Sequence, residues 1–150
     1  MLKAIANDSL ISGIFEMKII PEQHLITADV ANKNNRIYPK ALLEKLVVKH
    51  SQKEGVGTVG YPEWLPDELF GTVPLDKIAF AWSNLRLVEN NLLADIKILP
   101  TPEGQKLEQL MSESEFGFRT FGVSTLDKEN IIGDDYQLIG LAALPLSQCA

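Results

Sequence analysis

The stretch Asp29-Val30-Ala31-Asn32-Lys33-Asn34-Asn35-Arg36-Ile37-Tyr38-Pro39-Lys40 joins two segments with different hydrophobic patterns. Asn32 to Asn35 are all polar, which is typical of a loop. Pro39 suits the first turn of a helix, because the N–H that proline lacks has no helical partner there. An apolar stripe at helical spacing follows, formed by Leu42, Leu43, Leu46 and Val47. The pattern predicts a loop that leads into a helix over residues 39–50.

Two runs that alternate apolar and polar residues precede this stretch. They cover residues 12–20 and 24–30, and a period of two is typical of half-buried strands. Pro21-Glu22-Gln23 separates them. We therefore expect the two runs to pair as a hairpin across these three residues.

A long connection follows the predicted helix. Residues 51–67 contain Gly55, Gly57, Gly60 and two prolines, which predicts an irregular loop. Long ordered loops in small domains are often functional. The aromatic and apolar part of this loop, Tyr61, Pro62, Trp64 and Leu65, is expected to form a protein interface, with a cover over the core as the alternative.

The second half of the chain contains four strand-like runs and one helix-like run. The strands are predicted at residues 78–89 and 92–99, around Asn90-Asn91, and at 116–125 and 136–144, around a turn at 127–135. Thr101 and Pro102 predict a helix start between the two pairs. This order indicates one α+β domain over residues 1–150, a mainly antiparallel β-barrel or sheet with two or more packed helices, in which residues 1–10 form an N-terminal arm.

Composition excludes several classes of protein. A chain of 150 residues that is 45% hydrophobic suits one globular domain, and its net charge of -6 argues against nucleic-acid binding. The one cysteine, Cys149, permits no intrachain disulfide or thiolate metal site, and we expect it to be inert. No apolar run reaches membrane-spanning length. The acidic residues between Asp127 and Asp135 lack calcium-loop spacing, so the sequence predicts no metal and no cofactor.

The opening stretch resembles a specific motif. Asn32 to Pro39 reads N-x-N-x-R-x-Y-P, which is similar to the segment that begins the first helix in prohead core proteases of large tailed phages. Three further features follow in that family's order: Gly60-Tyr61-Pro62, Thr101 to Gly104, and Gly122-Val123-Ser124. The resemblance implies the herpesvirus-protease fold, which is a small β-barrel ringed by helices, and a part in capsid assembly.

The same resemblance raises a question about catalysis. Ser124 matches the nucleophile, but Tyr61 stands where the family has its catalytic histidine, and Ala142 stands where its acidic residue is expected. Thr125-Leu126-Asp127 replaces the residues that shape the oxyanion site in the family. A tyrosine with a pKa of about 10 is protonated at neutral pH and is a poor general base. Three departures thus fall on three catalytic features.

These departures favour a non-catalytic phage structural or assembly protein that binds capsid or other virion subunits, as a decoration or stabilising protein. It would reside in the virion or prohead, and in the host cytoplasm during assembly. The alternative is an active prohead maturation serine protease that cleaves scaffold and capsid precursor with Ser124. A base relocated to His24 or His50 is disfavoured, because catalysis demands accurate placement. A host-directed binding module and a homo-oligomer both remain open.

Overall fold

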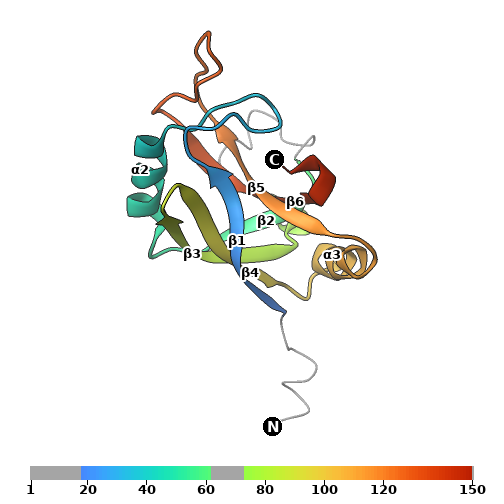
Figure 1. Ribbon diagram of the computed structural model, residues 1–150. Helices are drawn as coiled ribbons and strands as arrows, with labels where there is room; N and C mark the ends of the chain where they lie inside the picture. Colours follow the sequence, from blue (N-terminus) through green and yellow to red (C-terminus); the bar gives the residue numbers. More distant parts are fainter. Residues whose placement is uncertain (1–17, 62–72, 150) are drawn as a thin grey trace.

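The computed structural model describes residues 18–61 and 73–149 (Figure 1). These residues form one six-stranded sheet in the order β1-β4-β3-β2-β6-β5. The strands are β1 (Ile19–Thr27), β2 (Gly55–Val59), β3 (Phe80–Val88), β4 (Asn91–Ile98), β5 (Phe116–Val123) and β6 (Gln137–Pro145). The helices are α2 (Lys40–His50) and α3 (Pro102–Glu113), with short 3₁₀ turns η2 (Leu75–Lys77) and η3 (Leu146–Gln148).

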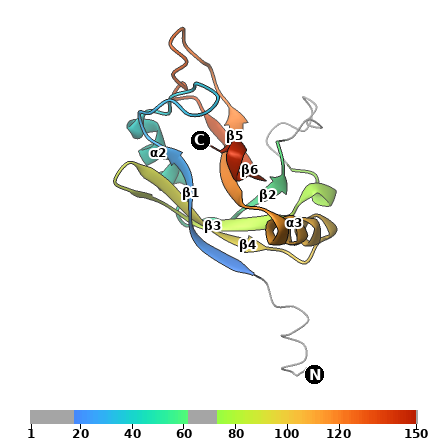
Figure 2. The same cartoon turned by 45° about the vertical axis from the view of Figure 1, so that its right-hand side comes forward.

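The sheet is mixed and curled. Its neighbouring strands run antiparallel except β2 and β6, which are parallel. Curling brings the edge strands β1 and β5 towards each other, as the two views in Figures 1 and 2 show. In the described residues these two edges form no hydrogen-bonded ladder. The α+β class with a mainly antiparallel sheet and two helices is confirmed, whereas the barrel is only half closed.

The core lies inside the curl and under the helices. Phe80 of β3 and Phe118 of β5 meet edge to face, with ring centroids 5.1 Å apart. Leu43 of α2 and Leu107 of α3 are completely buried against the same cluster. Burial of these apolar side chains supplies most of the stabilisation of the sheet and its helices. Neither of the two described α-helices is long and apolar enough to cross a membrane.

Both predicted helices are present. Helix α2 begins at Lys40, directly after Pro39, whose carbonyl accepts the first backbone bonds from Leu42 and Leu43. Helix α3 begins at Pro102 after the cap Thr101. The Thr101 hydroxyl accepts a hydrogen bond from the Gly104 N–H at 2.9 Å and donates one to the Ile78 carbonyl at 2.6 Å. The cap therefore fixes α3 to the chain before β3.

The predicted hairpin across Pro21 is wrong. Residues 19–27 form one strand, β1, which pairs with β4 along its length. The pairing shifts between Ile20 and Gln23, and Glu22 adopts a φ of 55° while its N–H donates to Asp95 at 3.0 Å. A bulge on an edge strand tolerates a proline, because the missing N–H has no ladder partner. The earlier predicted strand residues, 12–17, lie outside the described part of the chain.

The irregular loop predicted after α2 is also partly wrong, because residues 55–59 form strand β2 between β3 and β6. Its glycines are explained by two aromatic rings. Gly55 lies opposite Trp82, and Gly57 lies opposite Phe80. A Cβ atom would come within 2.3 Å of the Trp82 ring or 2.0 Å of the Phe80 ring. Small residues are therefore required where the rings pack over β2.

The two remaining strand pairs match the predictions to within two residues. The β3–β4 turn is Glu89-Asn90, one residue earlier than expected. Asn91 is already part of β4, where it pairs with Val88 of β3. Glu89 adopts the positive φ that this turn requires, at 56°. Strand β5 ends at Val123 instead of residue 125, and β6 begins at Gln137 instead of 136.

Candidate functional site

A cavity of about 660 Å³ lies where β5 ends, and we call it the Ser124 cavity. Its walls come from three parts of the chain: the loop before α2, Tyr61 two residues after β2, and β5 with the loop that follows it. The lining residues are Asn32, Asn34, Arg36, Tyr38, Tyr61, Arg119, Thr120, Phe121, Gly122, Val123, Ser124, Leu126, Ile132 and Tyr136. Ser124 and Tyr61, which are distant in sequence, thus share one cavity.

Ser124 is exposed directly after β5, where its hydroxyl donates to the Thr125 carbonyl at 2.8 Å. The following residue is held by a carboxylate from the other side of the loop. Asp135 accepts hydrogen bonds from the Thr125 N–H at 3.1 Å and the Thr125 hydroxyl at 3.0 Å. These two bonds lower the pKa of Asp135, because they stabilise its charged form. The acidic turn therefore shapes the loop after Ser124.

Tyr61 is half-buried at the rim of the same cavity. Burial raises the pKa of its phenol, and the nearby positive charges of Arg119 and Arg36 only partly oppose this effect. The phenol is therefore protonated at neutral pH. It can donate a hydrogen bond into the cavity, but it is not suited to accept a proton from Ser124.

Both histidines of the chain are described, and neither lines the Ser124 cavity. His24 lies on β1, where its Nε2 is 2.8 Å from the Thr27 hydroxyl. Burial lowers the pKa of His24, and a hydrogen bond with Asn91 opposes this shift. His50 ends α2 with its ring centroid 6.0 Å from that of Trp82. Burial is also the main reason why the pKa of His50 is lowered.

Ala142 lies on β6 and is completely buried. It is paired with Thr58 of β2 on one side and with Arg119 of β5 on the other. Its side chain packs in a small apolar cluster with Phe121 and Leu144. The residue expected at the acidic position therefore makes sheet and core contacts and does not line the cavity.

In the sequence, the Asn32–Pro39 motif indicates the fold and the start of a helix. In the structure, residues of this motif also line the Ser124 cavity. The Asn32 side chain accepts hydrogen bonds from the N–H groups of Asn34 at 2.9 Å and Arg36 at 3.0 Å, which closes a tight loop. Ile37 then pairs with Ile131 in the loop between β5 and β6. This docking brings Asn32, Asn34 and Arg36 to the wall of the Ser124 cavity.

Sequence reasoning missed Arg119 entirely. This residue lies in the middle of β5 and is only 7% exposed, yet it lines the Ser124 cavity. Its guanidinium donates to the Gln148 carbonyl at 3.4 Å. An arginine within the otherwise uncharged run Phe116 to Val123 was the available signal, because a buried charge in a strand usually has a partner or a purpose.

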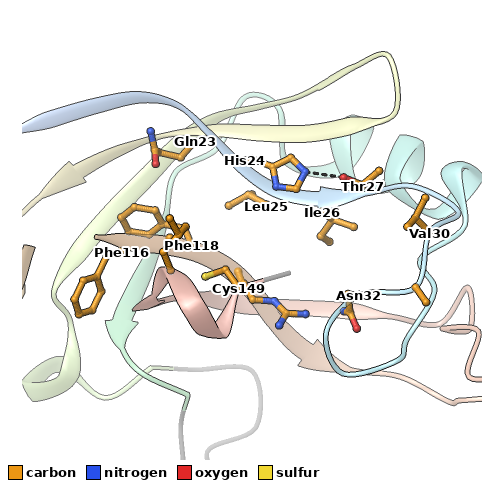
Figure 3. A pocket seen from close by; sticks show the side chains of 14 residues that line it. Gln23, His24, Leu25, Ile26, Thr27, Val30, Asn32, Phe116, Phe118 and Cys149 are labelled. Atoms are coloured by element: carbon orange, nitrogen blue, oxygen red, sulfur yellow. Dashed lines mark hydrogen bonds between the residues drawn. The ribbon is translucent and has the colours of Figure 1, made fainter. Parts of the chain in front are cut away.

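A second, smaller cavity of about 340 Å³ lies between the two sheet edges, and we call it the β1–β5 cavity (Figure 3). Gln23 to Thr27 form one wall, and Phe116 to Arg119 form the other. Asn32 and Arg119 line both cavities. Cys149 also borders this space, and burial raises the pKa of its thiol, so the thiol is protonated at neutral pH.

Two further expectations concern metals and interfaces. Over residues 18–61 and 73–149, no group of three or more His, Cys, Asp or Glu side chains is arranged to hold a metal ion. In the predicted interface loop, Tyr61 is 39% exposed where it lines the Ser124 cavity. Pro62, Trp64 and Leu65 lie outside the described residues, so their part in an interface stays a prediction.

Comparison with known proteins finds a similar solved structure. No protein-family model and no curated protein sequence matches the chain. Among solved structures, that of the bacteriophage T4 capsid assembly protease gp21 is similar, with a TM-score of 0.60 over 85% of this chain and 90% of that chain. The two sequences are 18% identical. The chain therefore has the fold of a phage capsid assembly protease.

Proposed function

We propose that this protein is a non-catalytic phage assembly protein, which uses a protease-derived fold to bind capsid or other virion subunits. Its role would be decoration or stabilisation of the particle, in the prohead or virion. A fold can outlast the chemistry it once supported, because function depends on a few side chains in one site. The similarity to the T4 capsid assembly protease supports a connection with phage assembly.

One observation carries the non-catalytic part of this proposal. Ser124 and Tyr61 line the same cavity, and neither of the two histidines of the chain lines it. A serine hydroxyl needs a nearby base to become a nucleophile. Tyr61 cannot readily supply that base, because burial raises its pKa. The expected acid is likewise replaced by the buried Ala142.

The test is a cleavage assay with the purified protein and the capsid and scaffold precursors of the phage that encodes it. We expect the precursors to remain intact, at the same level with wild-type protein and with Ser124→Ala. Binding is measured in the same samples by co-sedimentation with proheads, where both proteins should pellet equally. Cleavage by the wild-type protein that is lost in Ser124→Ala would contradict the proposal.

An active maturation protease is the second candidate, because Ser124 is exposed on the wall of a cavity large enough for a peptide side chain. Copy number in mature particles separates the two candidates. An assembly protease is needed only until precursors are cut, whereas a decoration protein must remain. Quantitative mass spectrometry of purified virions should find the protein at a fixed ratio to the capsid subunit if it is structural.

A further inference from the structure

We propose that the Ser124 cavity is an anion site, in which Arg119 and Arg36 bind a small oxyanion, either a carboxylate or a phosphate group. This inference concerns a ligand of the cavity and does not depend on whether Ser124 is catalytic. It rests on the placement of two guanidinium groups, on the hydrogen-bond donors around them, and on the kinds of side chain that line the two adjoining cavities.

The first argument is the isolation of Arg119. Arg119 is only 7% exposed, and its one described hydrogen bond, to Gln148, is long at 3.4 Å. A guanidinium has five N–H donors. Among the described residues, the ion pairs within 4.0 Å involve Arg86 and do not involve Arg119. A buried charge without a counter-charge is costly, so a bound anion would stabilise this arrangement.

The second argument is the convergence of donors on the same space. Arg36 approaches from the loop opposite β5, and its charge, like that of Arg119, acts on the Tyr61 phenol. The hydroxyl of Tyr136 is buried in the wall, and among residues 18–61 and 73–149 it has no hydrogen-bond partner of good geometry, although Tyr38 and Thr120 lie beside it. Burial raises the pKa of Tyr136, which keeps this hydroxyl a donor. An anion would accept bonds from such groups.

The third argument is the absence of competing acids. No aspartate or glutamate is among the described residues that line the Ser124 cavity or the adjoining β1–β5 cavity. The chain as a whole carries a net charge of -6, so this concentration of positive charge is a local property. Guanidinium groups bind carboxylates and phosphates in paired hydrogen bonds. The charge and the donor set therefore select an oxyanion over a cation or a neutral ligand.

The experiment measures thermal unfolding of the full-length protein against sodium phosphate and sodium acetate, with sodium chloride at equal ionic strength as reference. We expect a saturable rise in Tm for the wild type, because a ligand of the native state stabilises it by mass action. Arg36→Gln should weaken the fitted affinity by about tenfold, the usual effect of losing a charge-assisted hydrogen bond. Arg86→Gln, which disrupts an ion pair with Asp95 elsewhere, should leave that affinity unchanged.

Arg119→Met should change the Tm relative to wild type in opposite directions without and with the oxyanion. In chloride this variant should be as stable as the wild type or more stable, because it removes a buried charge that has no counter-charge among the described residues. In saturating oxyanion the wild type should be more stable than Arg119→Met, because only the wild type gains the full stabilisation from binding. Arg36 is exposed, so Arg36→Gln keeps the test valid if Arg119→Met fails to fold.

The two arms distinguish the source of the anion. A lower saturation concentration for acetate indicates a carboxylate, as on a protein partner, and a lower one for phosphate indicates a phosphate group. Salts such as phosphate also stabilise proteins generally, without binding a site. A rise in Tm that does not saturate and is equal in wild type, Arg36→Gln and Arg86→Gln would overturn the proposal.

Discussion

Arg119 and Ala142 are cross-strand neighbours on β5 and β6, whereas the next residue of β6, Ala143, lies opposite Phe118. Directly opposed residues of an antiparallel pair present their side chains to the same face. A carboxylate at position 142 would therefore lie beside the Arg119 guanidinium, and one at position 143 would enter the main core. The two alanines are equally buried, which makes them a matched pair.

We accordingly predict that Ala143→Asp unfolds the protein or costs about 3–5 kcal/mol, the penalty of an uncompensated buried charge. Ala142→Asp should cost about 2 kcal/mol less, because Arg119 supplies a charge-assisted hydrogen bond. Urea denaturation monitored by tryptophan fluorescence gives both free energies of unfolding. Equal losses in the two variants would show that Arg119 does not reach position 142.

Asp135 gives a prediction about acid stability. Its folded-state pKa is lowered by hydrogen bonds from Thr125, so its contribution to stability is present above the ordinary pKa and disappears as pH falls through the folded pKa. Asp135→Asn should lower Tm at neutral pH, and the difference from wild type should shrink as the pH falls below about 4. Thermal scans across this pH range provide the measurement.

The neighbouring Asp134 is the control for this experiment. It is exposed like Asp135, but in the described structure its carboxylate accepts no hydrogen bond from Thr125. Asp134→Asn should therefore give nearly the same Tm as wild type at every pH. If both variants lose stability together, the effect is due to overall charge and not to the loop after Ser124.

At the scale of elements, β2 depends on glycines that lie under aromatic rings. Gly57→Ala would place a methyl group within 2.0 Å of the Phe80 ring, so we predict a loss of about 1–3 kcal/mol from overpacking, measured by urea denaturation. Gly57→Ala combined with Phe80→Leu should be less destabilised than the sum of the two changes, since both alter one contact. Additive losses would mean that the methyl group and the ring do not compete for space.

Helix α3 depends on its cap. Thr101→Ala removes the acceptor for the Gly104 N–H and the donor to the Ile78 carbonyl, and we expect it to cost about 1–2 kcal/mol. Thr101→Ser keeps the hydroxyl and should recover most of that free energy. Chemical denaturation of wild type, Thr101→Ala and Thr101→Ser gives the three free energies of unfolding to be compared. A serine variant as unstable as the alanine variant would assign the effect to the methyl group.

At the scale of the whole molecule, local patterns predicted the local elements. The alternation of residues 92–98 and the cap at Thr101 are decided by neighbours in sequence, so β4 and the start of α3 were predicted to within one residue. Strand β2 was not, because its glycines resemble a loop until Trp82 and Phe80 are seen packing over them. The bulge at Glu22 was missed for a similar reason, since its partner Asp95 is distant in sequence.

The site was predicted in part. The family resemblance assigns Tyr61 and Ser124 to two catalytic positions, and in the structure both residues line one cavity. In the sequence Arg36 stood out only as part of the family motif, and Arg119 did not stand out, because no sequence pattern reports which side of a curled sheet opens into a cavity. Ala142 was taken for a vacated catalytic position, and it is a buried contact of β5 and β6.

The five residues of β2 have a consequence for motion. In the described sheet they join two larger units, β1-β4-β3 and β6-β5, through only a short antiparallel and a short parallel ladder. Partial unfolding of proteins often begins where few contacts join two units. We expect amide hydrogens of Thr58 and Val59 to exchange with solvent before those of Leu92 and Ala94 in β4, as native-state hydrogen exchange can measure. Because β1 and β5 belong to different units, transient opening of the β2 ladders would change the width of the β1–β5 cavity.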